Sequence, residues 1–133
     1  RQPISQRFAV TGAVDQFGNV QAVGGINEKI EGFFRVCKIH GITGKQGIIL
    51  PGTNAQQLNL SDEVIAAVEA GQFHIHPVDH VEEAIELLTG CVAGEPDMPD
   101  TLFGRIQDRL DELNGTAPKS GVLRNLLGRL FGL

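Results

Sequence analysis

The sequence has no tryptophan, no tyrosine, only two cysteines and a single methionine, Met98. Because the chain does not begin with methionine, we expect that Arg1 is not its natural N-terminus. The two cysteines, Cys37 and Cys91, belong to no cysteine motif. Disulfides are rare in reducing compartments, so we expect two free thiols and a cytoplasmic location.

Long apolar runs and a surplus of basic residues are also missing. No run approaches the roughly 20 apolar residues that span a bilayer, and no signal peptide is visible, so no membrane partner is expected. The net charge is −5 and the pI is about 5.3, so nucleic-acid binding is not indicated. With 133 residues and 41% hydrophobic content, the chain is long enough for one domain with its own core.

The first part of the chain, residues 1–94, alternates strand and helix patterns. This order predicts an α+β fold in which helices pack on a mixed sheet. One helix should begin with a capping box made by Asp79 and Glu82. The expected elements are two strands within 7–23, a helix at 26–39, a strand at 47–50, a helical stretch at 54–58, a helix between Ser61 and Gly71, a strand at 72–78 and a helix up to Gly90.

Residues 95–133 differ in character. The stretch "EPDMPD" reads as a linker, because it combines two prolines with three acids. Two amphipathic helical segments follow, "TLFGRIQDRLDEL" and the basic "VLRNLLGRLFGL". A membrane-surface role is conceivable for the last segment. Its small polar face favours docking on a neighbouring subunit or domain instead.

Lys29 breaks the apolar pattern of the helix expected at 26–39. At about 100° per residue it lies near Ile26 and Phe33, on the edge of the apolar face. One interpretation is that its stem covers this edge while its ammonium reaches water. The other is a partly desolvated amine near a helix N-terminus, where burial and the helix dipole both disfavour the charged form. Such an amine can act as the general base of a Ser–Lys hydrolase.

The motifs around Lys29 occur in a specific order. A "TG" pair in the first strand is followed by a glycine at the hairpin, "GG-x-x-E-K" at the start of a helix, and a short apolar strand ending in proline. With "SDEVIAAVEAGQFHIHPVDHVEEAIELLTG", this set resembles the C-terminal proteolytic domain of Lon proteases (peptidase S16-type) over about residues 7–90. The stretch "NEKIEGFF" is more similar to the Lon-B-like branch of bacterial homologues than to the standard Lon branch.

The resemblance implies a serine endopeptidase that hydrolyses peptide bonds in protein substrates with a Ser–Lys dyad. Lys29 matches the catalytic lysine, and Thr11 matches a threonine whose hydroxyl helps to orient the amine. The family serine lies in a "P-S-A-G"-like motif, which this sequence does not contain. We therefore expect the nucleophile upstream of this chain and an inactive isolated chain.

The resemblance also implies a ring-shaped homo-oligomer, commonly a hexamer, and ATP-dependent proteolysis. No Gly-rich loop ending in Lys-Ser/Thr occurs here, so ATP and Mg are expected on an absent ATPase module. The alternative is a non-catalytic Lon-like domain that serves assembly or binding, as in some DNA-repair ATPases. The "GG-x-x-E-K" motif argues against this alternative, and the missing serine argues for it.

The motif "HIHPVDH" places His74 and His76 on one face of a strand, with Asp79 and His80 close by. Metal binding is conceivable for such a group. Because no cysteine or Glu-x-x-His companion accompanies the histidines, we predict no metal site and no cofactor site in this chain.

Overall fold

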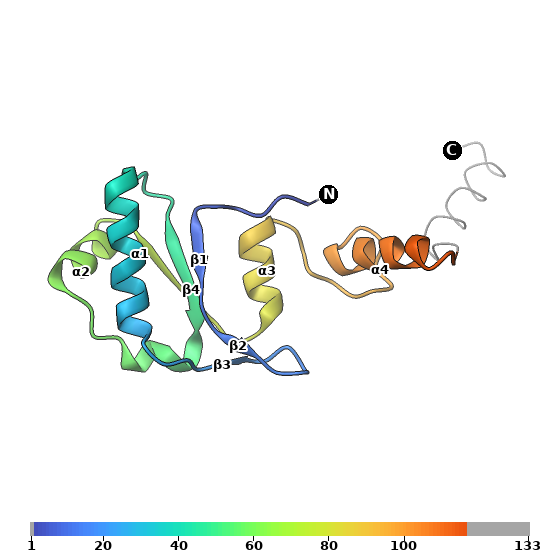
Figure 1. Ribbon diagram of the computed structural model, residues 1–133, viewed down its shortest axis with the longest axis horizontal. Coiled ribbons are helices and arrows are strands. Elements are labelled where there is room, and N and C mark those ends of the chain that lie inside the picture. The colour runs from blue at the N-terminus through green and yellow to red at the C-terminus, as the bar shows by residue number, and fades with distance from the viewer. Residues whose placement is uncertain (1, 117–133) are drawn as a thin grey trace. The chain divides into compact units, whose positions relative to one another are not determined.

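Figure 1 shows the computed structural model of the chain, in which residues 2–116 are described. These residues form two compact units that divide between Thr89 and Gly90. This division lies slightly before the expected boundary after Gly94, and the roles assigned to the two parts stay predictions. The first unit contains β1 (Phe8–Val10), β2 (Ala13–Val14), β3 (Val20–Gln21), α1 (Ile26–His40), β4 (Gly47–Pro51), the 3-10 helix η1 (Gly52–Gln57), α2 (Asp62–Glu69), β5 (His74–Val78) and α3 (Val81–Thr89).

The α+β fold expected from the sequence is confirmed, with two separate small sheets. Strands β1, β4 and β5 form a parallel sheet in the order β1-β4-β5. Strands β2 and β3 form an antiparallel hairpin. Because β4 is central in a parallel sheet, it is buried on both faces, which explains its continuous apolar sequence.

The core lies on both sides of β4 (Figure 1). Ile48 and Leu50 pack with the buried residues of α1 and α2 and with Phe73. Ile49, which points to the opposite face, packs with Val78 and with Ala84 of α3. The alternation along one strand therefore fixes the layers: α1 and α2 cover one face of the sheet, and α3 covers the other.

The residues expected as two strands, 7–23, form three instead. β1 joins the parallel sheet, and the chain then turns away at Thr11 and Gly12 into the hairpin. At the hairpin tip, the Asp15 carboxylate accepts hydrogen bonds from the backbone N–H groups of Phe17 and Asn19 and from the Asn19 amide. The Asn19 side chain and these backbone bonds hold the pKa of Asp15 below its usual value.

The capping box expected at the start of α3 uses a different acid. Helix α3 begins at Val81, and the carboxylate of Glu83 accepts from the backbone N–H groups of Asp79 (3.1 Å) and His80 (2.9 Å). Glu82 was predicted for this role and does not fill it. The helix begins later than the Asp79 cap requires, so the acid that reaches back is one residue further along.

The second unit contains α4 (Leu102–Leu113), which confirms the first of the two helical segments expected after residue 95. The hydroxyl of Thr101 caps this helix by accepting from Gly104 N (3.2 Å). The "EPDMPD" segment before it folds into turns, and Leu102 N donates to Val92 O (2.9 Å). The last predicted segment, "VLRNLLGRLFGL", lies outside the described residues.

Candidate functional site

Thr11 lies where β1 ends, at the carboxyl edge of the parallel sheet. Its backbone N–H donates to Ile49 O (3.0 Å), which extends the β1–β4 ladder by one bond. In open α/β sheets, the carboxyl ends of parallel strands are the usual place for ligands and reacting groups. The fold therefore presents Thr11 at the edge where a site is expected.

Lys29 lies in the first turn of α1, and a glycine turn places it there. Gly25 is the N-cap residue and has a φ of 66°, a left-handed conformation that favours glycine. The Lys29 N–H donates to Gly25 O (3.1 Å) and so closes the first helical turn. The prediction that the Gly24–Gly25 pair makes a tight turn ahead of Lys29 is confirmed, with Gly25 as the residue that requires the special backbone.

Asn54 joins this turn to the carboxyl end of β4. Its side chain, which is 0% exposed, accepts from Val23 N (3.0 Å) and donates to Val23 O (3.1 Å). The same amide donates to Gln57 Oε1 (2.9 Å). Since Asn54 belongs to η1, directly after β4, it fixes the chain immediately before the Gly24–Gly25 turn. Our sequence interpretation missed this residue, although a polar residue that follows a buried strand at this edge was a usable signal.

One flank of α1 is tied to the segment before α2. Asn27 accepts from Asn59 N (2.8 Å) and donates to Gln57 O (3.1 Å). One turn further, the carboxylate of Glu31 accepts from the backbone and the hydroxyl of Ser61. These contacts fix the rotation of α1 about its axis, and thereby the direction of the other flank. Neither residue was singled out from the sequence.

Lys29 lies on that other flank and is exposed. Ile26 is buried at 4% exposure and Phe33 is partly buried, so both pack into the core and do not cover the amine. Of the two interpretations of Lys29, the one in which its ammonium reaches water agrees with this exposure, and no shielding of the amine is present among the described residues. Val36, about two turns after Lys29, is 47% exposed on the same flank, so this side of α1 is uncovered there.

The structure brings Thr11 and Lys29 to the same edge of the sheet, without a hydrogen bond between their side chains. Thr11 ends a strand paired with β4, and Asn54 ties the turn before Lys29 to the residues that follow β4. Between residues 2 and 116, neither side chain makes a hydrogen bond or an ion pair. Their catalytic roles stay predictions.

Other nucleophiles in the described residues are poorly placed. Ser5 precedes β1 and lies toward the opposite, amino edge of the sheet. Ser61 is engaged by Glu31. Cys37 is a core residue, and its burial raises the pKa of the thiol, so the reactive thiolate is disfavoured. Neither Cys37 nor Cys91 forms a disulfide within residues 2–116.

The histidines of β5 do not form a metal centre. His74 and His76 share a face, with ring centroids 6.1 Å apart, but the Nε2 of His74 donates to Gly44 O (2.8 Å). His80 contacts Phe17 O at the hairpin tip instead (3.0 Å). In the part of the chain that the structure describes, no three His, Cys, Asp or Glu side chains gather as a metal site requires.

Comparison with known proteins gives a family match over the first unit. Residues 1–90 match the model of the Lon protease (S16) C-terminal proteolytic domain. The chain is similar to two bacterial proteins named putative Lon protease homolog. It is 46% identical to the Haemophilus influenzae protein over 127 residues, 96% of this chain. It is 48% identical to the Escherichia coli K12 protein over 108 residues, 81% of this chain. An archaeal Lon protease from Halobacterium salinarum is 29% identical over 120 residues, 90% of this chain.

These relatives are much longer than the chain. The matched regions make up 18% of each of the two bacterial proteins and 15% of the archaeal one. The family match ends at residue 90, beside the division between the two compact units. None of the helices between residues 2 and 116 combines the length and the apolar character that crossing a bilayer demands.

Proposed function

Because this chain belongs to the Lon protease (S16) C-terminal proteolytic domain family, we propose that it is the C-terminal part of a serine endopeptidase domain that cleaves protein substrates. Lys29 is the general base of a Ser–Lys dyad, and Thr11 positions its amine. The nucleophilic serine comes from a segment outside this chain. The match of the chain to only 18% of the bacterial relatives is compatible with such a segment.

The observation that carries this proposal is the uncovered flank of α1 at the carboxyl edge of the sheet. The Lys29 side chain is exposed there and has no hydrogen-bond or ion-pair partner among residues 2–116, and the half-exposed Val36 lies on the same flank about two turns further along. The opposite flank is fixed by Asn27 and Glu31. A segment that brings a serine onto the open flank would also cover Val36 and remove water from around the amine.

The proposed reaction follows from the chemistry of the two side chains. The serine Oγ attacks the carbonyl carbon of the scissile peptide bond, while the neutral amine of Lys29 accepts the hydroxyl proton. Lys29 then gives this proton to the departing amine, and an acyl-enzyme remains. Water then attacks the acyl-enzyme: Lys29 accepts a proton from the water and passes it to the serine Oγ as the acid product leaves. The Thr11 hydroxyl accepts a hydrogen bond from the Lys29 amine and keeps its lone pair directed at the serine.

The wider setting of the reaction is also part of the proposal. We place ATP and Mg on an ATPase module outside this chain, since the sequence contains no Gly-rich loop ending in Lys-Ser/Thr. We also propose a hexameric ring, as the family resemblance implies, and a cytoplasmic location, based on the two cysteines without a disulfide motif. The rival function, a non-catalytic Lon-like domain for assembly or binding, rests on the missing serine in this sequence.

The proposal is tested by comparing the isolated chain with the longer protein that contains it. We expect the longer protein to hydrolyse casein and a fluorogenic peptide, and the purified 133-residue chain to hydrolyse neither. Both are assayed with and without ATP and Mg. An inactive longer protein that still assembles would favour the non-catalytic rival. Turnover by the repurified chain would show that it contains its own nucleophile.

The role of Thr11 calls for a pair of variants in the longer protein. Thr11→Val removes the hydroxyl, so we expect kcat for peptide hydrolysis to fall by about 10- to 100-fold, the worth of one hydrogen bond to a charged or reacting group. Thr11→Ser keeps the hydroxyl and should restore most of the rate. Thr53→Val, at an exposed threonine of η1, is the control. Equal rates for Thr11→Val and the wild type would remove Thr11 from the site.

A further inference from the structure

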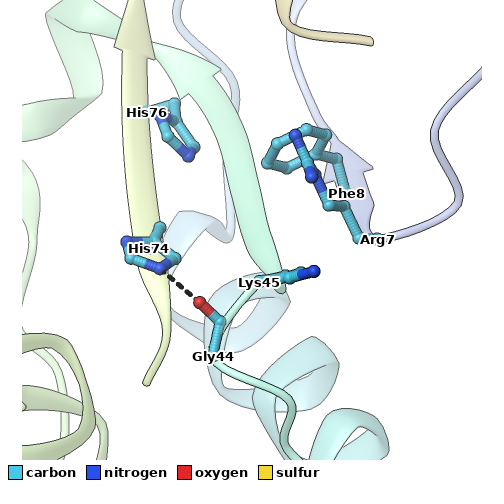
Figure 2. Close-up of a pocket in the computed structure, with 6 residues that line it drawn as sticks. All are labelled: Arg7, Phe8, Gly44, Lys45, His74 and His76. Atoms are coloured by element: carbon cyan, nitrogen blue, oxygen red, sulfur yellow. Dashed lines mark hydrogen bonds between the residues drawn. The ribbon is translucent and has the colours of Figure 1, made fainter. Parts of the chain in front are cut away.

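A pocket lies at the amino edge of the parallel sheet, on the face that α3 covers. It is lined by Arg7, Phe8, Gly44, Lys45, His74 and His76 and has a volume of about 260 Å³ (Figure 2). The sheet register explains the hollow. Phe8 pairs with Gly47, and Gly47 pairs with His74, so a residue without a side chain lies between two rings.

All the ionisable residues that line this pocket are basic. Arg7, Lys45, His74 and His76 contribute to it, and no acid does, although the chain as a whole carries a net charge of −5. Helix α3 covers the same face and places none of its glutamates in the lining. Arg7 and Lys45 form no ion pair within residues 2–116. Their charges are therefore uncompensated by the described protein.

Several contacts hold these groups in place without neutralising them. The guanidinium carbon of Arg7 lies 4.8 Å from the ring centroid of Phe8, a cation–π arrangement. Phe8 also meets His76 edge to face, with ring centroids 5.3 Å apart. His74 donates through Nε2 to Gly44 O (2.8 Å), which fixes the orientation of its ring.

His76 is sensitive to its surroundings in the pocket. Burial, followed by the nearby His74 and Arg7, lowers the pKa of His76 below its usual value. The guanidinium of Arg7 is a positive charge that opposes a further one on this ring. The same field attracts an anion.

We propose that this pocket binds a phosphate group, either as inorganic phosphate or as part of a small phosphate ester. Arginine binds phosphate oxygens in a two-pronged geometry, and lysine supplies a compact positive charge beside it. The imidazole of His76 adds an N–H donor. A volume of about 260 Å³ admits a phosphate group with a small substituent. The site lies at the opposite edge of the sheet from Lys29 and does not depend on the proposed peptidase activity.

The test is a titration of the isotopically labelled 133-residue chain with inorganic phosphate and pyrophosphate, followed by backbone amide chemical shifts. Chloride keeps the ionic strength constant. We expect saturable shifts confined to residues 7–8, 44–47 and 74–76. Acetate, a compact carboxylate, is the comparison anion and should shift these amides much less at the same concentration.

Two charge-removing variants locate the site. Arg7→Gln and Lys45→Gln should each weaken phosphate binding by about tenfold, because each removes a charged donor. Both residues are exposed, so the fold should survive, and the shifts of distant amides check this. The matched control is Arg35→Gln, which removes the same charge from the exposed face of α1. It should leave the affinity nearly unchanged.

Three results would overturn the proposal. The first is the absence of saturable shifts at the pocket, and the second is acetate binding as tight as phosphate binding. The third is an equal loss of affinity in the Arg35 control, which would indicate a diffuse charge effect. Loss of binding in both pocket variants with an intact control would establish the site.

Discussion

Replacing Lys29 with arginine in the longer protein is expected to abolish peptide hydrolysis, with a fall in kcat of at least about a thousandfold. A general base must begin the reaction neutral, and the guanidinium of arginine stays protonated at working pH. Arginine keeps the positive charge and most of the aliphatic stem. Since the Lys29 side chain is exposed and makes no hydrogen bond or ion pair among residues 2–116, folding should be unaffected. The measurements are peptidase rate, circular dichroism and light scattering.

The matched control for this substitution is Lys38→Arg on the same helix. Lys38 is paired with Glu63, and arginine can form the same ion pair, so activity should remain close to that of the wild type. Near-normal turnover by Lys29→Arg would rule out the lysine as general base and return it to the role of an edge residue that covers apolar surface. A loss of activity shared by both variants would indicate that a disturbed helix α1, and not the loss of a general base, lowers the rate.

Asn54→Ala is expected to have the largest effect on stability. The substitution deletes two hydrogen bonds to the backbone of Val23 and one to Gln57, at a side chain that is fully buried. Unsatisfied groups at such a position cost about 2–4 kcal/mol of unfolding free energy in total. Denaturant unfolding followed by far-UV circular dichroism measures the difference.

Asn59→Ala provides the comparison for Asn54. Asn59 is exposed and its side chain makes no described hydrogen bond, so the change should stay within about 0.5 kcal/mol. In the longer protein, Asn54→Ala should also lower peptidase activity at temperatures where the fold persists, because the turn before Lys29 loses its anchor. If the two variants prove equally stable, Asn54 does not hold the turn as we infer.

Much of the fold could be predicted from local patterns. The apolar periodicity of α1, the glycines at both of its ends and the β-branched run of β4 all reflect requirements that act within a few residues. The pairing of β1 with β4 could not be read in this way, because it joins residues far apart in the sequence. The strand expected as half of a hairpin therefore belongs to the parallel sheet.

The candidate site was also predictable only where its residues belong to local sequence motifs. Lys29 and Thr11 were found from an ordered set of motifs, and Gly25 from the geometry of a tight turn. Asn54 was missed because its partner, the backbone of Val23, has no signature in the sequence. The sequence left the exposure of Lys29 open between two interpretations, since a helical pattern gives the direction of a side chain but not what lies opposite.

The position of β1 has a consequence for how the chain associates. In the order β1-β4-β5 both outer strands leave one side unpaired within the described sheet. β5 carries Pro77, which lacks an N–H group and makes a poor template for another strand. β1 consists of Phe8, Ala9 and Val10 and has no such protection. Its free edge can accept a further parallel or antiparallel strand, so the isolated chain should aggregate through β1 before it does so through any other part of this sheet.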